Sequence, residues 1–292
     1  MGAERTILRD ISQSPPMIVE DEPAHGSFPM PVRWAFAMSW LIVALMVVAS
    51  LAGLAVGHLY ADAAWGREAL RGGDLVTLAL VVPVFAVTLA RVGHGSARAR
   101  AVWMGLLAYG VYDYAYYVFG ARFNDIFLLH ITLFSLSVFA LATALPVIAR
   151  GPDAHMCRPR AARWGGAFLV VVGLLQGALW LFVLIRNAVT GELIAHVPVA
   201  GQHLVFALDL SLLVPSLIVA GVLLARRRPS GYVFGVAMAV MGAAYQVNLL
   251  VSGAFQAHAH VAGASAFPVA GVALTAAFLA TSAALLRRRS AG

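Results

Sequence analysis

The sequence predicts an all-α integral membrane protein with eight transmembrane helices. Hydrophobic residues make up 61% of the 292 residues and charged residues only 11%, and the mean hydropathy is +0.86. A soluble domain of this length is far less apolar. The apolar residues also fall in blocks of about 20, which is the length of helix that crosses the hydrocarbon core of a bilayer.

The predicted spans begin after a polar N-terminal tail. Residues 1–31 contain five prolines and an acidic run, which indicates a disordered tail and not a signal peptide. The first apolar run after this tail is already long enough to cross a membrane. The eight spans are expected at residues 34–57, 75–90, 101–119, 125–149, 164–185, 203–225, 231–252 and 266–286.

The arginine positions predict that both termini are cytoplasmic. The sequence has no lysine, and sixteen of its 20 arginines fall in the termini and in alternate connections between spans. The opposite side holds only Arg67, Arg71, Arg122 and Arg186. Because basic loops stay in the cytoplasm, we expect a multi-pass protein of the inner, or cell, membrane, with the lipid bilayer as its partner. This topology explains the pI of about 10.2, so no nucleic-acid partner is expected.

Composition excludes several kinds of site. The single cysteine, Cys157, excludes an internal disulfide and any cysteine-based zinc or iron–sulfur cluster. The absence of lysine excludes a retinal or pyridoxal Schiff base. The sequence also lacks the motifs of helical zinc proteases, of lipases and of P-loop enzymes.

The two halves of the chain resemble each other. The matching positions are Arg33-Trp34 with Arg163-Trp164, Val82-Pro83 with Val214-Pro215, and Tyr109 with Tyr245, at offsets of 130, 132 and 136 residues. Duplicated halves are common in transporters. We therefore expect two parallel four-helix repeats, residues 32–150 and 161–289. Chance similarity between apolar helices is the alternative.

The most polar sequence at membrane depth is residues 110–137, which contain Asp113 and His130. An ionisable side chain inside the bilayer is costly and usually serves a function. Asp113 is expected about 9 Å below the outer boundary of its span, at 1.5 Å per residue. His130, Asp209 and Asn248 fall at similar depth in three other spans. The sequence therefore predicts one polar layer in the outer leaflet.

Two sets of residues are predicted for this layer. The ligand-binding set is Asp113, His130, Asp209, Tyr109, Tyr112, Tyr116 and Asn248. The metal-binding set, for a divalent ion held by nitrogen and oxygen, is His130, Asp113, Asp209 and His203.

Simpler interpretations compete with these assignments. The tyrosines are also typical of an interfacial aromatic belt. Asn124 and Asp125 stand at the start of a predicted span, which favours a helix cap. His258 and His260 lie in a loop of small residues, where histidines are usually solvated.

Three functions remain open. The favoured one is binding and translocation of a small solute or cation, because parallel repeats would enclose a polar site and carry prolines where helices can flex. The second is a membrane-embedded metal-dependent enzyme with a His/Asp site open to the exterior. The third is a sensor or an assembly subunit.

Overall fold

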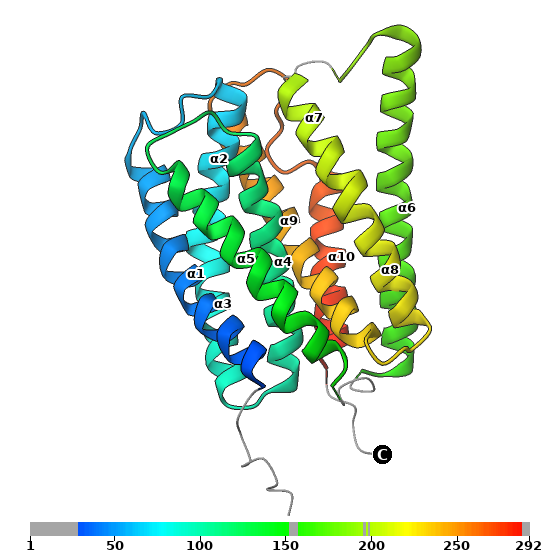
Figure 1. Cartoon of the computed structure of the whole chain (residues 1–292). Helices are drawn as coiled ribbons and strands as arrows, with labels where there is room; N and C mark the ends of the chain where they lie inside the picture. The colour runs from blue at the N-terminus through cyan, green and yellow to red at the C-terminus, as the bar shows by residue number, and fades with distance from the viewer. Residues whose placement is uncertain (1–28, 152–156, 195–196, 198, 288–292) are drawn as a thin grey trace, which may run out of the picture.

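The computed structural model describes residues 29–151, 157–194, 197 and 199–287, and they form long helices packed side by side (Figure 1). Most of the predicted N-terminal tail lies outside the described residues. The helical segments are α1 (Met30–Ala55), α2 (Ala64–Val76), η2 (Thr77–Val81), α3 (Val82–Gly93), α4 (Ala97–Phe119), α5 (Phe127–Ala149), α6 (Pro159–Thr190), α7 (Val199–Leu208), η4 (Asp209–Leu213), α8 (Val214–Ala225), α9 (Gly231–His258) and α10 (Val269–Leu286).

Seven helices within the described residues are long and apolar enough to cross a membrane, counting α2–α3 and α7–α8 as continuous helices. The predicted class of multi-pass membrane protein therefore agrees with the structure. The predicted span that is not among these seven is residues 101–119, which lies in α4; this helix has 23 residues, as many as α5, but is less apolar because it carries Asp113 and several tyrosines. These polar groups lie inside the bundle, since α4 packs against α3, α5 and α9.

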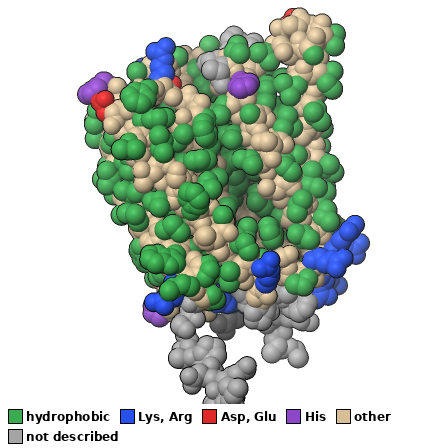
Figure 2. Space-filling model, in the orientation of Figure 1, with side chains coloured by type: hydrophobic (Ala, Val, Ile, Leu, Met, Phe, Trp, Pro, Cys, Tyr) green, Lys and Arg blue, Asp and Glu red, His purple; other side chains and the backbone are tan. Residues whose placement is uncertain are grey.

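The surface has the polarity of a membrane protein. Hydrophobic side chains cover the face drawn in Figure 2, and several arginines gather at the end where the described chain begins and ends. Trp34, Val171 and Leu175 are among the large apolar side chains that remain exposed on this bundle. Such a surface suits contact with lipid.

Several predicted spans are shorter than the helices in the structure. Helix α2 begins at Ala64 and not near residue 75, and α6 continues to Thr190. The additional turns of α2 carry Arg67, Glu68 and Arg71, which lower the local hydropathy without stopping the helix. Hydropathy therefore located the edge of the apolar segment, whereas the helix itself continues beyond that edge.

Two helices contain a π-helical segment directly before a Val-Pro pair. These segments are η2 before Val82-Pro83 and η4 before Val214-Pro215, each five residues long. Proline has no N–H, and its ring clashes with the carbonyl four residues earlier. A wider π-helical turn relieves that clash while the chain continues in the same direction. Both π segments lie within continuous helices, η2 between α2 and α3 and η4 between α7 and α8.

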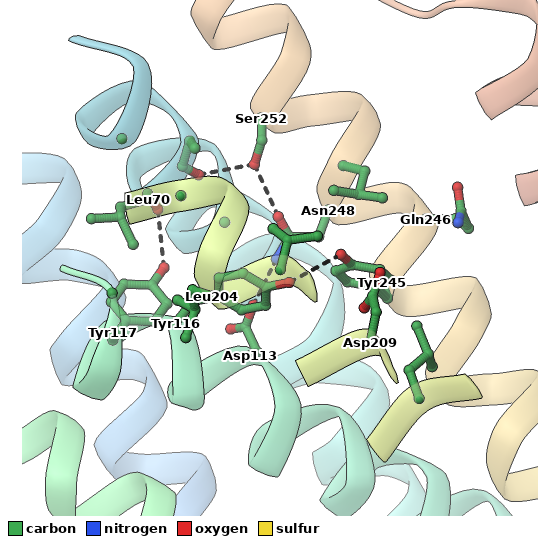
Figure 3. Close-up of a pocket in the computed structure, with 18 of the residues that line it drawn as sticks. Leu70, Asp113, Tyr116, Tyr117, Leu204, Asp209, Tyr245, Gln246, Asn248 and Ser252 are labelled. Carbon is green, nitrogen blue, oxygen red and sulfur yellow. Dashed lines mark hydrogen bonds between the residues drawn. The ribbon is translucent and has the colours of Figure 1, made fainter. Parts of the chain in front are cut away.

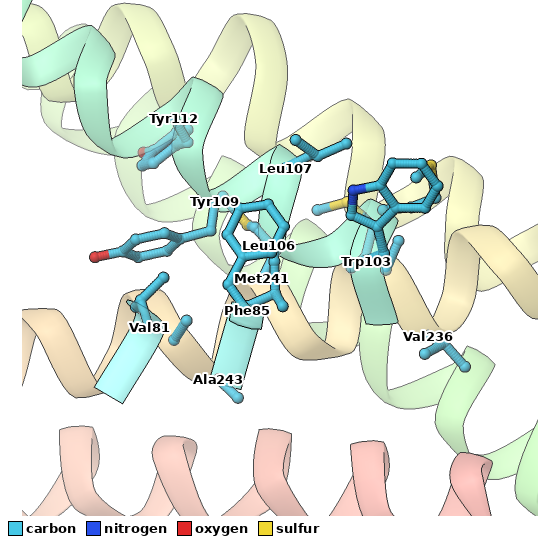
Figure 4. Packing of buried hydrophobic residues seen from close by; sticks show 14 of the residues in the cluster. Val81, Phe85, Trp103, Leu106, Leu107, Tyr109, Tyr112, Val236, Met241 and Ala243 are labelled. Carbon is cyan, nitrogen blue, oxygen red and sulfur yellow. The ribbon is translucent and has the colours of Figure 1, made fainter. Parts of the chain in front are cut away.

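Helices α4 and α9 form the centre of the bundle. Helix α4 contacts α3 and α5, and α9 contacts α8 and α10. Gly105 of α4 makes close contact possible, since a Cβ there would lie 2.7 Å from the carbonyl oxygen of Ala237 in α9. Large side chains around Trp103 and Tyr109 fill the surrounding core (Figure 4). The Trp103 indole donates to Ser39 Oγ at 2.8 Å, so its polar atom is satisfied.

Helix α2 and helix α7 pack differently against this centre. Helix α2 lies along α9, where a Cβ on Gly72 would approach the backbone of Ser252 to 2.6 Å. Helix α7 makes few contacts with α4, and its Leu204 lies against Gly120, the residue directly after α4. Because α7 packs less closely on α4 than α2 does on α9, space remains between α4 and α7.

The structure predicts that the two ends of α9 lie on opposite sides of the membrane. In a Cys157→Ser background, Ser230→Cys and Ser265→Cys should react with a membrane-impermeant maleimide from opposite sides, because α9 separates them and is long enough to cross. Labelling of both cysteines from the same side of intact cells would contradict this arrangement.

Candidate functional site

A cavity of about 380 Å³ lies between α2, α4, α6, α7–α8, α9 and α10 (Figure 3). Its volume falls in the range of pockets that bind small molecules. Asp62, Asp113 and Asp209 contribute carboxylates to the lining, and no arginine, lysine or histidine is among the described lining residues. The cavity is therefore acidic.

Asp113 has one satisfied and one unsatisfied carboxylate oxygen. Its side chain is 5% exposed, and Oδ1 accepts a hydrogen bond from Nδ2 of Asn248 at 2.8 Å. Oδ2 has no hydrogen-bond partner among the described residues. Buried carboxylate oxygens are almost always paired. Asp113, which is among the residues that line the cavity, therefore retains one buried acceptor without a partner.

The Asn248 amide is held in place by its neighbours. Nδ2 also donates to the Tyr109 hydroxyl at 3.0 Å, and Oδ1 lies 2.9 Å from Ser252 Oγ. Because its acceptor oxygen is engaged by Ser252, the amide directs its donors toward Tyr109 and Asp113. This network fixes the orientation of the Asp113 carboxylate (Figure 3).

Asp209, by contrast, is fully paired. It is the first residue of the π-helical segment η4 and is 1% exposed. Its carboxylate accepts hydrogen bonds from the Tyr112 hydroxyl, from Gln176 Nε2 at 3.0 Å and from Trp180 Nε1 at 2.6 Å. These donors come from α4 and α6. Asp209 thus connects both helices to the irregular segment of the α7–α8 helix.

Three tyrosines extend this network along the cavity. The Tyr116 hydroxyl lies 3.2 Å from the Tyr112 hydroxyl and 3.3 Å from the Tyr245 hydroxyl. The rings of Tyr112 and Tyr245 meet edge to face, with centroids 4.9 Å apart. Tyr116 and Tyr245 line the cavity, whereas Tyr112 does not. The tyrosines of α4 therefore face protein and cavity.

A further carboxylate, Asp74, lies next to the cavity and was not part of the predicted set. The sequence placed it outside the membrane, because the predicted span began at residue 75. The structure buries it to 2% exposure inside the longer α2. Tyr60 donates to its Oδ2 at 2.7 Å and Tyr117 to its Oδ1 at 3.1 Å. Burial raises the pKa of the Tyr60 phenol, so it remains a donor at neutral pH.

The structure brings together much of the predicted ligand-binding set. Asp113, Tyr116, Asp209 and Asn248 line the cavity. Tyr109 and Tyr112 do not line it, but they are hydrogen-bonded to residues that do.

His130 does not join them. It is fully buried between aromatic rings, with its ring centroid 4.8 Å from that of Tyr117, and both ring nitrogens lack a partner among the described residues.

The predicted metal-binding set is not assembled in the structure. His203 is exposed on α7, while His130 packs against Tyr117 away from the cavity lining. Within the described residues no group of three or more histidine, cysteine, aspartate or glutamate side chains has the geometry of a metal site. Of the four residues, only Asp113 and Asp209 line the cavity.

Gln176 and Trp180 were missed by sequence reasoning. They stand one turn apart on α6, a helix whose other residues at this depth are apolar. One signal was present, because a glutamine with a tryptophan four residues later on the same helix face can offer two donors to one acceptor. Asn124 is not the cap of α5, because the N-cap is Ile126 and has no side-chain cap hydrogen bond; Asn124 Oδ1 instead accepts from the backbone N–H of Ile126 at 3.2 Å in the turn before the helix.

No protein-family model, curated protein or solved structure matches this chain. The assignment of function therefore rests on the geometry and chemistry of the cavity.

The hydrogen bond between Trp180 and Asp209 should be measurable as an energetic coupling. In a double-mutant cycle with Trp180→Phe and Asp209→Asn, we expect the changes in unfolding free energy to depart from additivity by about 0.5–3 kcal/mol, because the two side chains share a buried contact. The control cycle combines Trp180→Phe with Asp125→Asn, which is exposed and distant from the cavity lining. Equal additivity in both cycles would contradict the network.

Proposed function

We propose that the protein binds a small cationic solute in this cavity and moves it across the membrane. The observation that carries the proposal is the unpartnered Oδ2 of Asp113 in an acidic cavity with no basic side chain among its described lining residues. Carboxylates at membrane depth are tolerated when they meet water, a partner or a ligand. A cation in the cavity would supply the missing partner.

The geometry of Asp209 supports coupling between binding and movement. Asp209 lines the cavity and also begins η4, the π-helical segment that precedes Pro215. π-Helical turns and prolines are places where helices bend. A cation that changes the hydrogen bonds of Asp209 would therefore act on the part of the α7–α8 helix most able to bend.

Two close contacts between residues that line the cavity lie near the beginning of α7. Leu204 lies against Gly120, and a Cβ on Gly201 would lie 2.8 Å from the Trp65 ring. Both contacts join α7 to residues of the other half of the chain. We propose that α7 turns about η4 and Pro215, separating Leu204 from Gly120 to admit the solute.

The proposal includes the parallel repeat of residues 32–150 and 161–289. Its support is the pair of π-helical segments, which begin at Thr77 and Asp209, an offset of 132 residues. Val82-Pro83 and Val214-Pro215 have the same offset.

The repeat also accounts for the site of the cavity. The residues 132 positions after Gly72 and Gly73 are Leu204 and Val205. Glycine lets α2 approach α9, whereas the larger side chains of α7 keep it away from α4. In this proposal one half is close-packed and its counterpart is open, which leaves room for a solute.

We further propose that both ends of the chain face the cytoplasm across the cell membrane, as the arginine distribution favours. The cavity would then lie toward the exterior, because α2 and α7 begin at the end of the bundle opposite to the described chain ends (Figure 1). Cysteines at positions 230 and 265 would react from the inside and the outside, respectively. The metal-dependent alternative has less support, since neither His130 nor His203 lines the cavity with the two carboxylates.

Blocking the cavity should abolish transport. Purified protein in liposomes should give electrogenic currents on a solid-supported membrane with at least one member of a panel of sodium, potassium, methylammonium and 2-phenylethylammonium. We expect Val172→Trp to eliminate the current, because Val172 lines the cavity. The matched control is Val171→Trp, whose side chain is 52% exposed and outside the cavity lining. Currents that persist in Val172→Trp, or no current with any of the four cations, would overturn the proposal.

A further inference from the structure

The cavity also indicates the chemical class of its ligand. Building on the proposed function, we propose that the ligand is a protonated primary or secondary amine with an apolar body, and that the ammonium group donates an N–H to Oδ2 of Asp113. The proposal rests on the pairing of the two carboxylates, on the balance of polar and apolar lining, and on the aromatic rings around the acidic end.

The pairing of the carboxylates selects Asp113 as the ligand contact. Asp209 already accepts three hydrogen bonds, from Tyr112, Gln176 and Trp180. Asp113 accepts one from Asn248 on Oδ1, and its Oδ2 has no partner in the described part of the chain. A ligand that donates a hydrogen bond therefore gains most at Asp113 Oδ2. A charged donor makes a stronger bond to carboxylate than a neutral one does.

The rest of the lining favours an organic cation over a bare metal ion. Much of the wall is aliphatic or aromatic, with Leu213, Leu217, Leu274 and Phe278 on the side of α8 and α10. Calcium and magnesium need about six oxygen ligands gathered around one point, and within the described residues no three histidine, cysteine, aspartate or glutamate side chains are grouped for a metal ion. A cavity of about 380 Å³ is also far larger than a single ion requires. An apolar body attached to the ammonium group would fill that volume and cover the apolar wall.

Aromatic rings stand near the acidic side of the cavity. Tyr116, Tyr117 and Tyr245 line it together with Asp113, and Figure 3 shows these side chains arranged around the Asp113 carboxylate. Ring faces attract ammonium groups, and the interaction strengthens when water is excluded. A quaternary ammonium would use the rings but could not donate to Oδ2. The unpartnered oxygen therefore distinguishes an amine that carries an N–H from one that does not.

The volume also limits the size of the amine. A single aromatic ring or a short alkyl chain with an ammonium group fits a pocket of this size, whereas an aminophospholipid with two acyl chains does not. The ligand is thus a small free amine and not a lipid headgroup. Bilayers with and without phosphatidylethanolamine separate these two sources.

The test is a binding series on the full-length protein in phosphatidylcholine nanodiscs, measured by isothermal titration calorimetry. The probes are 2-phenylethylamine, its neutral isostere 2-phenylethanol, and its trimethylated quaternary analogue. We expect the amine to bind at least about tenfold more tightly than either analogue, because only the amine supplies both charge and N–H to Oδ2. Addition of phosphatidylethanolamine to the nanodisc should leave amine affinity unchanged. Competition by that lipid would overturn the assignment to a small free amine.

The variant arm uses Asp113→Asn, with Asp125→Asn as the control that removes an exposed carboxylate. Amine affinity should fall at least about tenfold in Asp113→Asn and stay at the wild-type value in Asp125→Asn. Equal affinity for amine and alcohol, equal affinity for the quaternary analogue, or an unchanged affinity in Asp113→Asn would each overturn the proposal. If Asp113→Asn does not fold, the probe series on the wild-type protein decides the question alone.

The two proposals fail in different ways. Currents carried by sodium or potassium and lost in Val172→Trp, together with no amine binding, would overturn the ligand class and leave the transport proposal standing. Amine binding that depends on Asp113, without current for any cation, would support the ligand class and overturn transport.

Discussion

The structure depends on how buried carboxylates at membrane depth are satisfied. Asp74 and Asp209 are surrounded by hydroxyl, amide and indole donors, whereas Asp113 retains an oxygen with no partner among the described residues. A buried polar atom without a partner costs about 1–3 kcal/mol, and more when it is charged. The tyrosine-rich face of α4 follows from this constraint, because that helix contributes Tyr117 to Asp74 and Tyr112 to Asp209.

The π-helical segments η2 and η4 are related to this arrangement of buried carboxylates. A regular α-helix would meet a clash before Pro83 and before Pro215, and η2 and η4 remove it by widening one turn. In η4 the first residue is Asp209, so a carboxylate, a helix defect and a proline lie within two turns of one helix. A ligand that changes the hydrogen bonds of Asp209 can therefore influence η4 and Pro215, because they lie within two turns of it.

Much of the fold followed from the sequence, and part of the site did too. The expected depth and the helical period predicted Asp113, Asp209 and Asn248 as neighbours, and all three line the cavity. Depth and period did not fix the rotation of each helix about its axis, which is why His130 has a similar depth but packs against Tyr117 instead of the cavity. Asp74 was missed because hydropathy underestimates the length of a helix whose first turns carry charged residues. The predicted span at residues 101–119, in α4, is less apolar than the helices that meet the hydropathy of a membrane span, because α4 turns its polar side chains into the bundle.

The central claim is that a cation occupies the cavity beside Asp113, and a structure with a heavy-atom ligand tests it most directly. Crystals or particles prepared with 4-bromo-2-phenylethylamine should show the bromine within the cavity, toward Leu274 and Phe278, and the amine nitrogen about 3 Å from Oδ2 of Asp113. A bromine peak on the lipid-facing surface, or a nitrogen bound to Asp209 while Asp113 Oδ2 stays unpartnered, would contradict the account.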